Sequence, residues 1–160
     1  MPITKYHKNG FSLLEALVAL FLLTMGIIPA LLVATASSRS SDTIKNSLIG
    51  SQLAQEGAEI VRALRDADWF AGDAFGTRVT AGDWEVSWDD DALFPATGQA
   101  LLINTAGIYS YTEGDETPFV RTLNISSQGV GQFLVQSEVV WEERGRTRSV
   151  VVESHIYDWY

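Results

Sequence analysis

The sequence predicts an α+β fold: a long N-terminal α-helix, membrane-spanning in its first half, with an antiparallel β-sheet packed on its C-terminal half. Three observations support this prediction. An apolar run follows Phe11, no proline interrupts residues 30–94, and strand-like alternation recurs from residue 84 onward. Because an amphipathic helix cannot bury its apolar stripe alone, we expect the sheet to cover it.

Composition excludes several classes of function. The chain has 20 acidic and 11 basic residues and a net charge of −9, which argues against direct nucleic-acid binding, since that requires clustered Lys and Arg. Cysteine is absent, which excludes disulfides, thiolate zinc sites and thiol nucleophiles. There is no phosphate loop, activated-serine motif or metal-ligand spacing, so we expect neither an enzyme nor a small-molecule substrate.

The N-terminal segment has the composition of a membrane span behind a short polar leader. Residues 1–10 are polar and carry Lys5 and Lys8, and 23 residues without a charged side chain separate Glu15 from Arg39. About 20 apolar residues cross a bilayer as a helix. The lysines predict a cytoplasmic amino end, so the rest of the chain is translocated across the inner, cytoplasmic membrane.

A secretory signal peptide and a plain signal anchor are the alternatives for this segment. The apolar stretch before Ala34-Thr35-Ala36 is too long for a signal peptide, whereas an anchor fits the length equally well. An anchor does not explain Glu15, because a carboxylate near the start of an uncharged span is costly and usually has a partner.

Cleavage between Gly10 and Phe11 would supply that partner. The new α-amino group would lie four residues before Glu15, which is about one helical turn. Ammonium and carboxylate can then pair within one chain or between neighbouring chains. In a core of low dielectric, this pairing would set the axial register of one subunit on the next.

The octapeptide Lys8-Asn9-Gly10-Phe11-Ser12-Leu13-Leu14-Glu15 resembles the cleavage and methylation motif of type IV prepilins and of type II secretion pseudopilins. The resemblance implies the pilin fold. It also implies that a prepilin peptidase cuts after Gly10 and methylates the amine of Phe11. The implied partners are other major and minor pilins and an inner-membrane assembly platform, and the implied final location is a pilus at the cell surface.

Gly26 and Pro29 lie inside the span. Proline removes a backbone donor and clashes with the preceding turn, so we expect a kink or loosening near residues 25–29. One reading is a segment that melts and stretches in the packed filament, as in pilins of this family. The other is a proline that a membrane helix simply tolerates.

The sequence divides into four predicted parts. These are a leader (1–10), a transmembrane or filament-core helix (11–36), an amphipathic stalk helix (37–68) and a globular β-sheet head (69–160). The predicted strands are 84–88, 100–103, 108–111, 119–125, 132–142 and 146–157. Glu143-Arg144-Gly145 predicts a tight turn that joins the last two as a hairpin.

Two stretches narrow the resemblance within the family. Residues 56–62, and the ending that includes Trp141-Glu142-Glu143-Arg144-Gly145-Arg146 and Tyr157-Asp158-Trp159, are similar to PilV-type minor pilins. Those are related to the I-type minor pseudopilins of secretion systems. This C-terminal similarity is less specific than the N-terminal motif.

Two acidic clusters are candidates for a calcium site, the one cofactor that the sequence suggests. Asp89, Asp90 and Asp91 lie in one predicted loop, and Glu113, Asp115 and Glu116 lie in another. Calcium prefers six to eight oxygen ligands, which two converging loops could supply. The spacing fits no EF-hand pattern, and acidic loops are more often simply solvated.

The leading hypothesis is a minor pilin that is incorporated by packing of its N-terminal helix and that initiates, caps or modifies a type IV pilus-like filament. The nearest alternative is a minor pseudopilin of a type II secretion or DNA-uptake system. A third is a signal-anchored envelope protein whose head binds a ligand or calcium.

Overall fold

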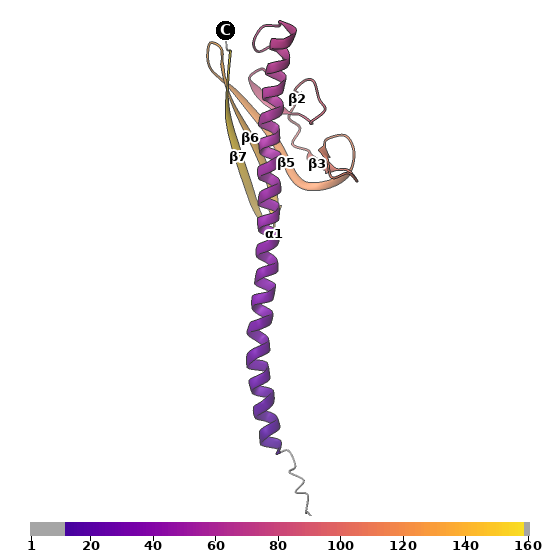
Figure 1. The fold of residues 1–160 in the computed structure, drawn as a ribbon, viewed down its shortest axis with the longest axis vertical. Coiled ribbons are helices and arrows are strands. Elements are labelled where there is room, and N and C mark those ends of the chain that lie inside the picture. The colour runs from indigo at the N-terminus through magenta and orange to yellow at the C-terminus, as the bar shows by residue number, and fades with distance from the viewer. Residues whose placement is uncertain (1–11, 159–160) are drawn as a thin grey trace, which may run out of the picture. The chain divides into compact units, whose positions relative to one another are not determined.

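The computed structural model describes residues 12–158, and the chain divides into two compact units, Met1–Asp42 and Thr43–Tyr160. The described part of the first unit is helical. The second, called the C-terminal unit below, joins the remainder of that helix to seven strands (Figure 1). The architecture is α+β and pilin-like: one long N-terminal apolar helix followed by a curled antiparallel sheet, as predicted.

Helix α1 (Leu13–Ala71) has 59 residues and ends three residues later than the predicted Asp68. Gly72, at φ 73°, terminates it in a Schellman motif. The Gly72 N–H donates to the Trp69 carbonyl at 3.1 Å and the Asp73 N–H donates to the Asp68 carbonyl at 2.9 Å. Glycine is required there because the left-handed conformation carries a penalty for residues with a Cβ.

The sheet has seven strands and every pairing in it is antiparallel. Strand β5 is its centre: β6 and then β7 pair along one edge, and β1 and β3 share the other edge, each followed by its own partner, β2 or β4. The strands are β1 (Gly82–Glu85), β2 (Phe94–Pro95), β3 (Ala100–Ile103), β4 (Tyr109–Ser110), β5 (Asp115–Gly129), β6 (Gln132–Glu143) and β7 (Arg146–Tyr157).

Long-range pairing lengthens or moves several predicted strands. Strand β5 begins at Asp115 rather than at residue 119, because Leu102 pairs with Glu116 and Ile103 with Asp115. Asp115 and Glu116 therefore lie in a strand and not in the loop predicted for them. Strand β1 ends at Glu85, short of the predicted 88, and the two-residue β2 was not predicted.

Two hairpins join neighbouring strands, and the one predicted for the last two strands is confirmed. Strands β3 and β4 turn at Gly107, whose N–H donates to the Asn104 carbonyl at 2.9 Å. Strands β6 and β7 are joined by Arg144 and Gly145 alone, at φ 53° and 72°. Two consecutive residues with positive φ are typical of a type I′ turn, whose twist matches that of the flanking strands.

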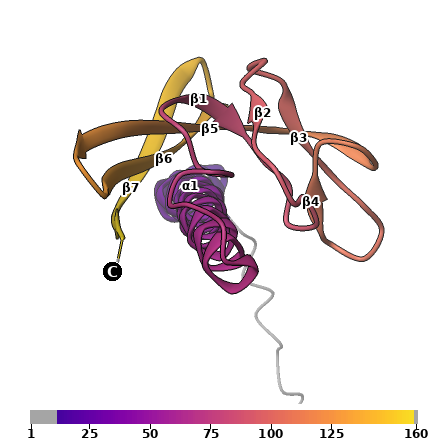
Figure 2. The same cartoon turned by 90° about the horizontal axis from the view of Figure 1, so that it is seen from above.

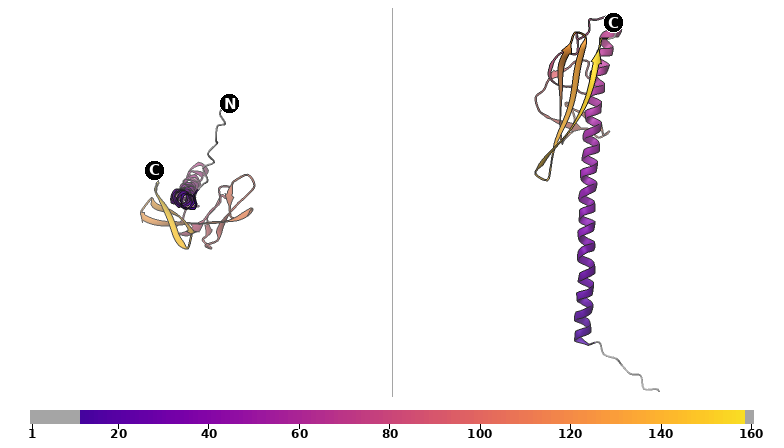
Figure 3. Two further views of the ribbon diagram at one scale, coloured as in Figure 1. Left: turned by 90° about the horizontal axis from the view of Figure 1, so that it is seen from below. Right: turned by 90° about the vertical axis from the view of Figure 1, so that its left-hand side faces the viewer.

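Within the C-terminal unit, the sheet curves over one side of α1 (Figure 2), and β6 and β7 run alongside the helix (Figure 3). Two apolar clusters fill the space between helix and sheet. One is formed by Val61, Leu64, Val79, Val86, Leu123, Ile125, Val135 and Ile156. The other is formed by Leu53, Ala54, Leu101, Phe119, Val139 and Trp141.

A buried arginine ties the layers together. Arg121 on β5 is 1 % exposed, and its guanidinium donates to the carbonyl of Leu53 on α1 at 3.1 Å and to the carbonyl of Val86 beyond β1. Its charge is balanced by Glu56 of the helix, at 3.5 Å. A guanidinium without partners cannot remain in an apolar core. These contacts therefore hold α1 against β5 and against the segment that follows β1.

Candidate functional site

The start of α1 has the local features of a stable helix N-terminus. The first helical hydrogen bond runs from the Ala16 N–H to the Ser12 carbonyl, at 3.0 Å, which makes Ser12 the N-cap residue. Glu15 is three residues further on and is the acidic residue of the first turn. Ser-x-x-Glu is the capping-box spacing, and a carboxylate there also interacts favourably with the helix dipole.

The following turns expose apolar side chains all around the helix. Fourteen large apolar residues between Leu13 and Val33 are 47 % to 79 % exposed. They are Leu13, Leu14, Leu17, Val18, Leu20, Phe21, Leu22, Leu23, Met25, Ile27, Ile28, Leu31, Leu32 and Val33. A helix that is apolar on every face needs lipid or other apolar helices around it. The helix is long and apolar enough to cross a membrane, by length and composition.

The few polar side chains of this stretch bond within the helix. The hydroxyl of Thr24 donates to the Phe21 carbonyl and that of Thr35 to the Leu32 carbonyl, each at 2.9 Å. Internal satisfaction of polar groups is what an apolar surrounding demands. The helix assignment is unbroken through Gly26 and Pro29, and the kink predicted there stays a prediction.

Gly10 and Phe11, the predicted cleavage and methylation positions, lie outside the described residues 12–158. Glu15 is exposed in the first turn of α1. Its pairing with the amine of a processed chain stays a prediction.

Comparison with known families bears directly on this junction. Residues 5–31 match the family model of the prokaryotic N-terminal methylation motif. The match covers Gly10, Phe11, Glu15 and both candidate kink residues. It supports a type IV pilin- or pseudopilin-type protein, structural rather than enzymatic, that is anchored as a membrane precursor, processed by prepilin peptidase and assembled with other pilins. No curated protein and no solved structure matches the chain.

The acidic residues proposed for calcium do not gather into one group of carboxylates in the described part of the chain. The carboxylate of Asp90 accepts a hydrogen bond from the Ser87 N–H at 2.6 Å, which closes the turn that follows β1. The Ser87 hydroxyl in turn accepts from the Tyr111 N–H at 3.2 Å, which joins the two segments that precede the acidic clusters. In the described part of the chain, no group of three or more His, Asp or Glu side chains is arranged to hold a metal ion. Calcium binding by Asp89, Asp90 and Asp91 stays a prediction.

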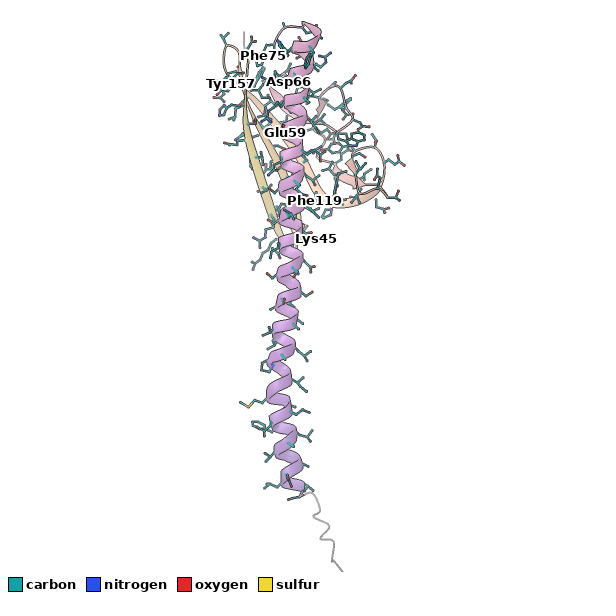
Figure 4. The ribbon with its side chains drawn as sticks, viewed as in Figure 1. Lys45, Glu59, Asp66, Phe75, Phe119 and Tyr157 are labelled. Carbon is teal, nitrogen blue, oxygen red and sulfur yellow. The ribbon has the colours of Figure 1, made fainter. Side chains whose placement is uncertain are left out.

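A cavity of about 680 Å³ at the end of α1 was not predicted from the sequence. Trp69 and Phe70 stand at its mouth, 53 % and 82 % exposed, with their rings 5.0 Å apart. Asp66, Phe75 and Tyr157 gather at the same end of the C-terminal unit (Figure 4). The wall is completed by Arg65, Asp68, Asp73, Ala74 and Asp158. These residues come together only because β7 ends beside the helix terminus.

Proposed function

We propose that this protein is a minor pilin, incorporated into a type IV pilus-like filament to initiate, cap or modify it. The observation that carries the proposal is the match of residues 5–31 to the N-terminal methylation motif, at the start of a helix whose apolar side chains are exposed on every side. Such a surface is suited first to lipid and then to the apolar helices of other subunits.

The proposed mechanism is assembly and not catalysis. The precursor inserts with its amino end in the cytoplasm, and prepilin peptidase cuts after Gly10 and methylates the amine of Phe11. The inner-membrane assembly platform then transfers the helix from lipid to the filament core. In that core, Glu15 of one subunit pairs with the amine of a processed chain, which selects the axial register.

The C-terminal unit supports a subunit role because its own helix and sheet enclose its apolar core. Its helix is held to the sheet by two apolar clusters and by Arg121, so it can stay folded while the exposed helix exchanges lipid for protein neighbours. A minor pseudopilin of a secretion or DNA-uptake system would use the same motif and fold. The choice of a pilus rests on the similarity of the C-terminal stretches to PilV-type minor pilins.

Mass spectrometry of the mature N-terminus tests the processing step. We expect a chain that begins at methylated Phe11 when prepilin peptidase is present, and an uncut chain when the peptidase gene is deleted. A mature protein that keeps residues 2–10 in cells with active peptidase would be a signal-anchored envelope protein. Immunogold labelling of sheared filaments, with a mutant lacking the secretion machine as control, separates a pilin from a pseudopilin.

A further inference from the structure

The C-terminal unit is strongly acidic, yet one of its ends is basic. Residues 43–160 carry 8 Lys/Arg and 18 Asp/Glu, a balance of 8 − 18 = −10. Four of the eight basic residues lie near the end of the unit where α1 enters it. We call these four, Lys45, Arg144, Arg146 and Arg148, the basic end.

The other four basic residues of the C-terminal unit are arginines, and each is paired with a carboxylate. Arg62 bonds Glu59 at 2.5 Å, Arg65 bonds Asp66 at 2.6 Å and Arg78 bonds Asp68 at 2.6 Å. The fourth, Arg121, lies 3.5 Å from Glu56. These charges are compensated inside the unit and present little positive potential to a partner.

The basic end is compensated much less. Lys45, Arg146 and Arg148 are exposed, and none of them makes an ion pair with a carboxylate among the described residues. Arg144, 47 % exposed, has Glu143 at 3.8 Å. The carboxylate of Glu143 is itself engaged by the Thr43 hydroxyl, at 2.7 Å. The charges of Lys45, Arg146 and Arg148 are therefore available to an external partner.

Strand register places two of the arginines on one face. Arg148 pairs with Trp141 and Arg146 with Glu143 across the β6–β7 hairpin. Cross-strand partners share a face, and Trp141 packs into the core beneath α1. Arg146 and Arg148 thus continue the helix-facing side of β7 beyond the core. Figure 4 shows Lys45 at this end of the unit, opposite Asp66 and Tyr157.

Chain length brings the basic end to the membrane surface. Thr43, bonded to the hairpin through Glu143, follows Ala36 by seven residues, a helical distance of about 10 Å. The polar headgroup layer on each side of a bilayer is about 5–8 Å deep. With the apolar run in the hydrocarbon core as far as Ala36, Thr43 lies just outside the headgroup layer and within a Debye length of its charges.

We propose that the basic end docks on anionic phospholipid headgroups while the precursor is in the membrane, and so holds the C-terminal unit at the bilayer surface before assembly. This inference rests on the membrane insertion in the proposed function. Lys and Arg near an anionic surface gain attraction for each charge, and salt screens that attraction within a Debye length. The rest of the unit is acidic and is repelled, which orients the basic end toward the lipid.

The test uses the full-length chain in nanodiscs, one chain per disc. The natural sequence has no cysteine, so Thr147→Cys supplies a single position for a fluorescent label beside the arginines. Quenching by nitroxide on lipid headgroups measures contact. We expect strong quenching in discs with about one-third anionic phosphatidylglycerol, weak quenching in neutral phosphatidylcholine discs, and loss of the difference at about 0.5 M salt.

Charge removal gives the quantitative prediction. Arg146→Gln together with Arg148→Gln should lower the ratio of docked to undocked molecules by about fivefold for each charge. Arg62→Gln, which removes one positive charge from the sheet-covered part of α1 away from the basic end, is the control and should change nothing. A label at Val130→Cys, on the turn between β5 and β6, should stay unquenched in both lipids.

Three outcomes would overturn the inference. Equal quenching in neutral and anionic discs excludes headgroup charge as the partner, and an unchanged signal in the double variant excludes these arginines. Quenching that requires two chains per disc assigns the basic end to the acidic surface of a neighbouring copy. Recovery of the chain in the disc fraction is scored separately: a chain that does not insert refutes the proposed function as well, whereas an inserted but unquenched chain refutes only the docking.

Discussion

The indole of Trp141 on β6 lies against Gly50 of α1, so close that a Cβ on Gly50 would stand 2.8 Å from a ring carbon. One and a half to two turns later, a Cβ on Gly57 would meet the Ser137 hydroxyl oxygen at 2.6 Å and a Leu123 methyl at 2.9 Å. These two glycines allow the helix to approach the sheet closely, which brings Arg121 within reach of the helix backbone.

Gly57→Ala is expected to destabilise the C-terminal unit by about 1–2 kcal/mol. Overpacking a closed core costs about 1–3 kcal/mol, and the better helix propensity of alanine returns up to about 1 kcal/mol. Chemical unfolding in detergent micelles, followed by tryptophan fluorescence, measures the change. Gly26→Ala is the matched control, since a Cβ on Gly26 has nothing within 4 Å. An unchanged midpoint for Gly57→Ala would show that the sheet yields there.

Arg121→Ala should cost about 3 kcal/mol or more, through a cavity and through the loss of hydrogen bonds to two buried carbonyls. Arg121→Met keeps most of the volume and leaves only the polar partners unsatisfied, so we expect a smaller loss. The same unfolding assay ranks the two variants. Equal stability of Arg121→Ala and the natural chain would mean that the guanidinium does not hold helix and sheet together.

Tyr111 predicts a loss of stability at alkaline pH. Burial raises the pKa of its hydroxyl above the ordinary value of about 10, while nearby Arg121 acts in the opposite direction. The unfolded chain therefore releases this proton at a lower pH than the folded chain does. Below about pH 10 this contribution to the free energy of unfolding is fully present and does not change with pH. As the pH rises beyond that value, the free energy of unfolding falls.

Tyr111→Phe should flatten this alkaline decline. At neutral pH the same variant should lose about 1 kcal/mol, because the hydroxyl donates to the Arg121 carbonyl at 3.0 Å. Unfolding midpoints between pH 7 and about pH 11 test both statements. Burial also raises the pKa of Tyr109, so Tyr109→Phe should flatten part of the decline. A decline that is identical in all three proteins would contradict the assignment.

Glu15→Ala should leave cleavage after Gly10 largely intact and reduce incorporation into filaments. Only the charged carboxylate can pair with a neighbouring ammonium, so Glu15→Gln should show the same defect although it keeps the size and the capping geometry. Immunoblots of sheared filaments and of whole membranes give incorporation and processing separately. Normal incorporation of Glu15→Gln would reduce the role of Glu15 to that of a helix cap.

The stretch that matches the methylation motif could be predicted from the sequence, because its features depend on residues close together in the chain. A basic leader, Gly10 before Phe11, a lone carboxylate and an uncharged run depend only on residue type and on spacing along the chain. The hairpin at Arg144-Gly145 was readable for the same reason, since its turn residues lie between two alternating strands. The end of α1 was missed by three residues although Gly72 marks it.

Tertiary structure decided what depends on residues far apart in the chain. Arg121 looks like any strand arginine until its partners, 35 and 68 residues away, enclose it. The length of β5 depends on pairing with β3, and the cavity beside Trp69 exists only where β7 ends at the helix terminus.

The sequence by itself therefore predicted a helix long and apolar enough to cross a membrane and a position for cleavage, because helix formation, transfer into lipid and recognition of a short motif are local properties. Only the fold decided how closely Gly50 and Gly57 let the helix approach the sheet, how the buried charge of Arg121 is balanced by Glu56, and which exposed arginines lie at the same end of the unit as Thr43. Those features depend on contacts between distant segments, and no pattern along the chain specifies such contacts one by one.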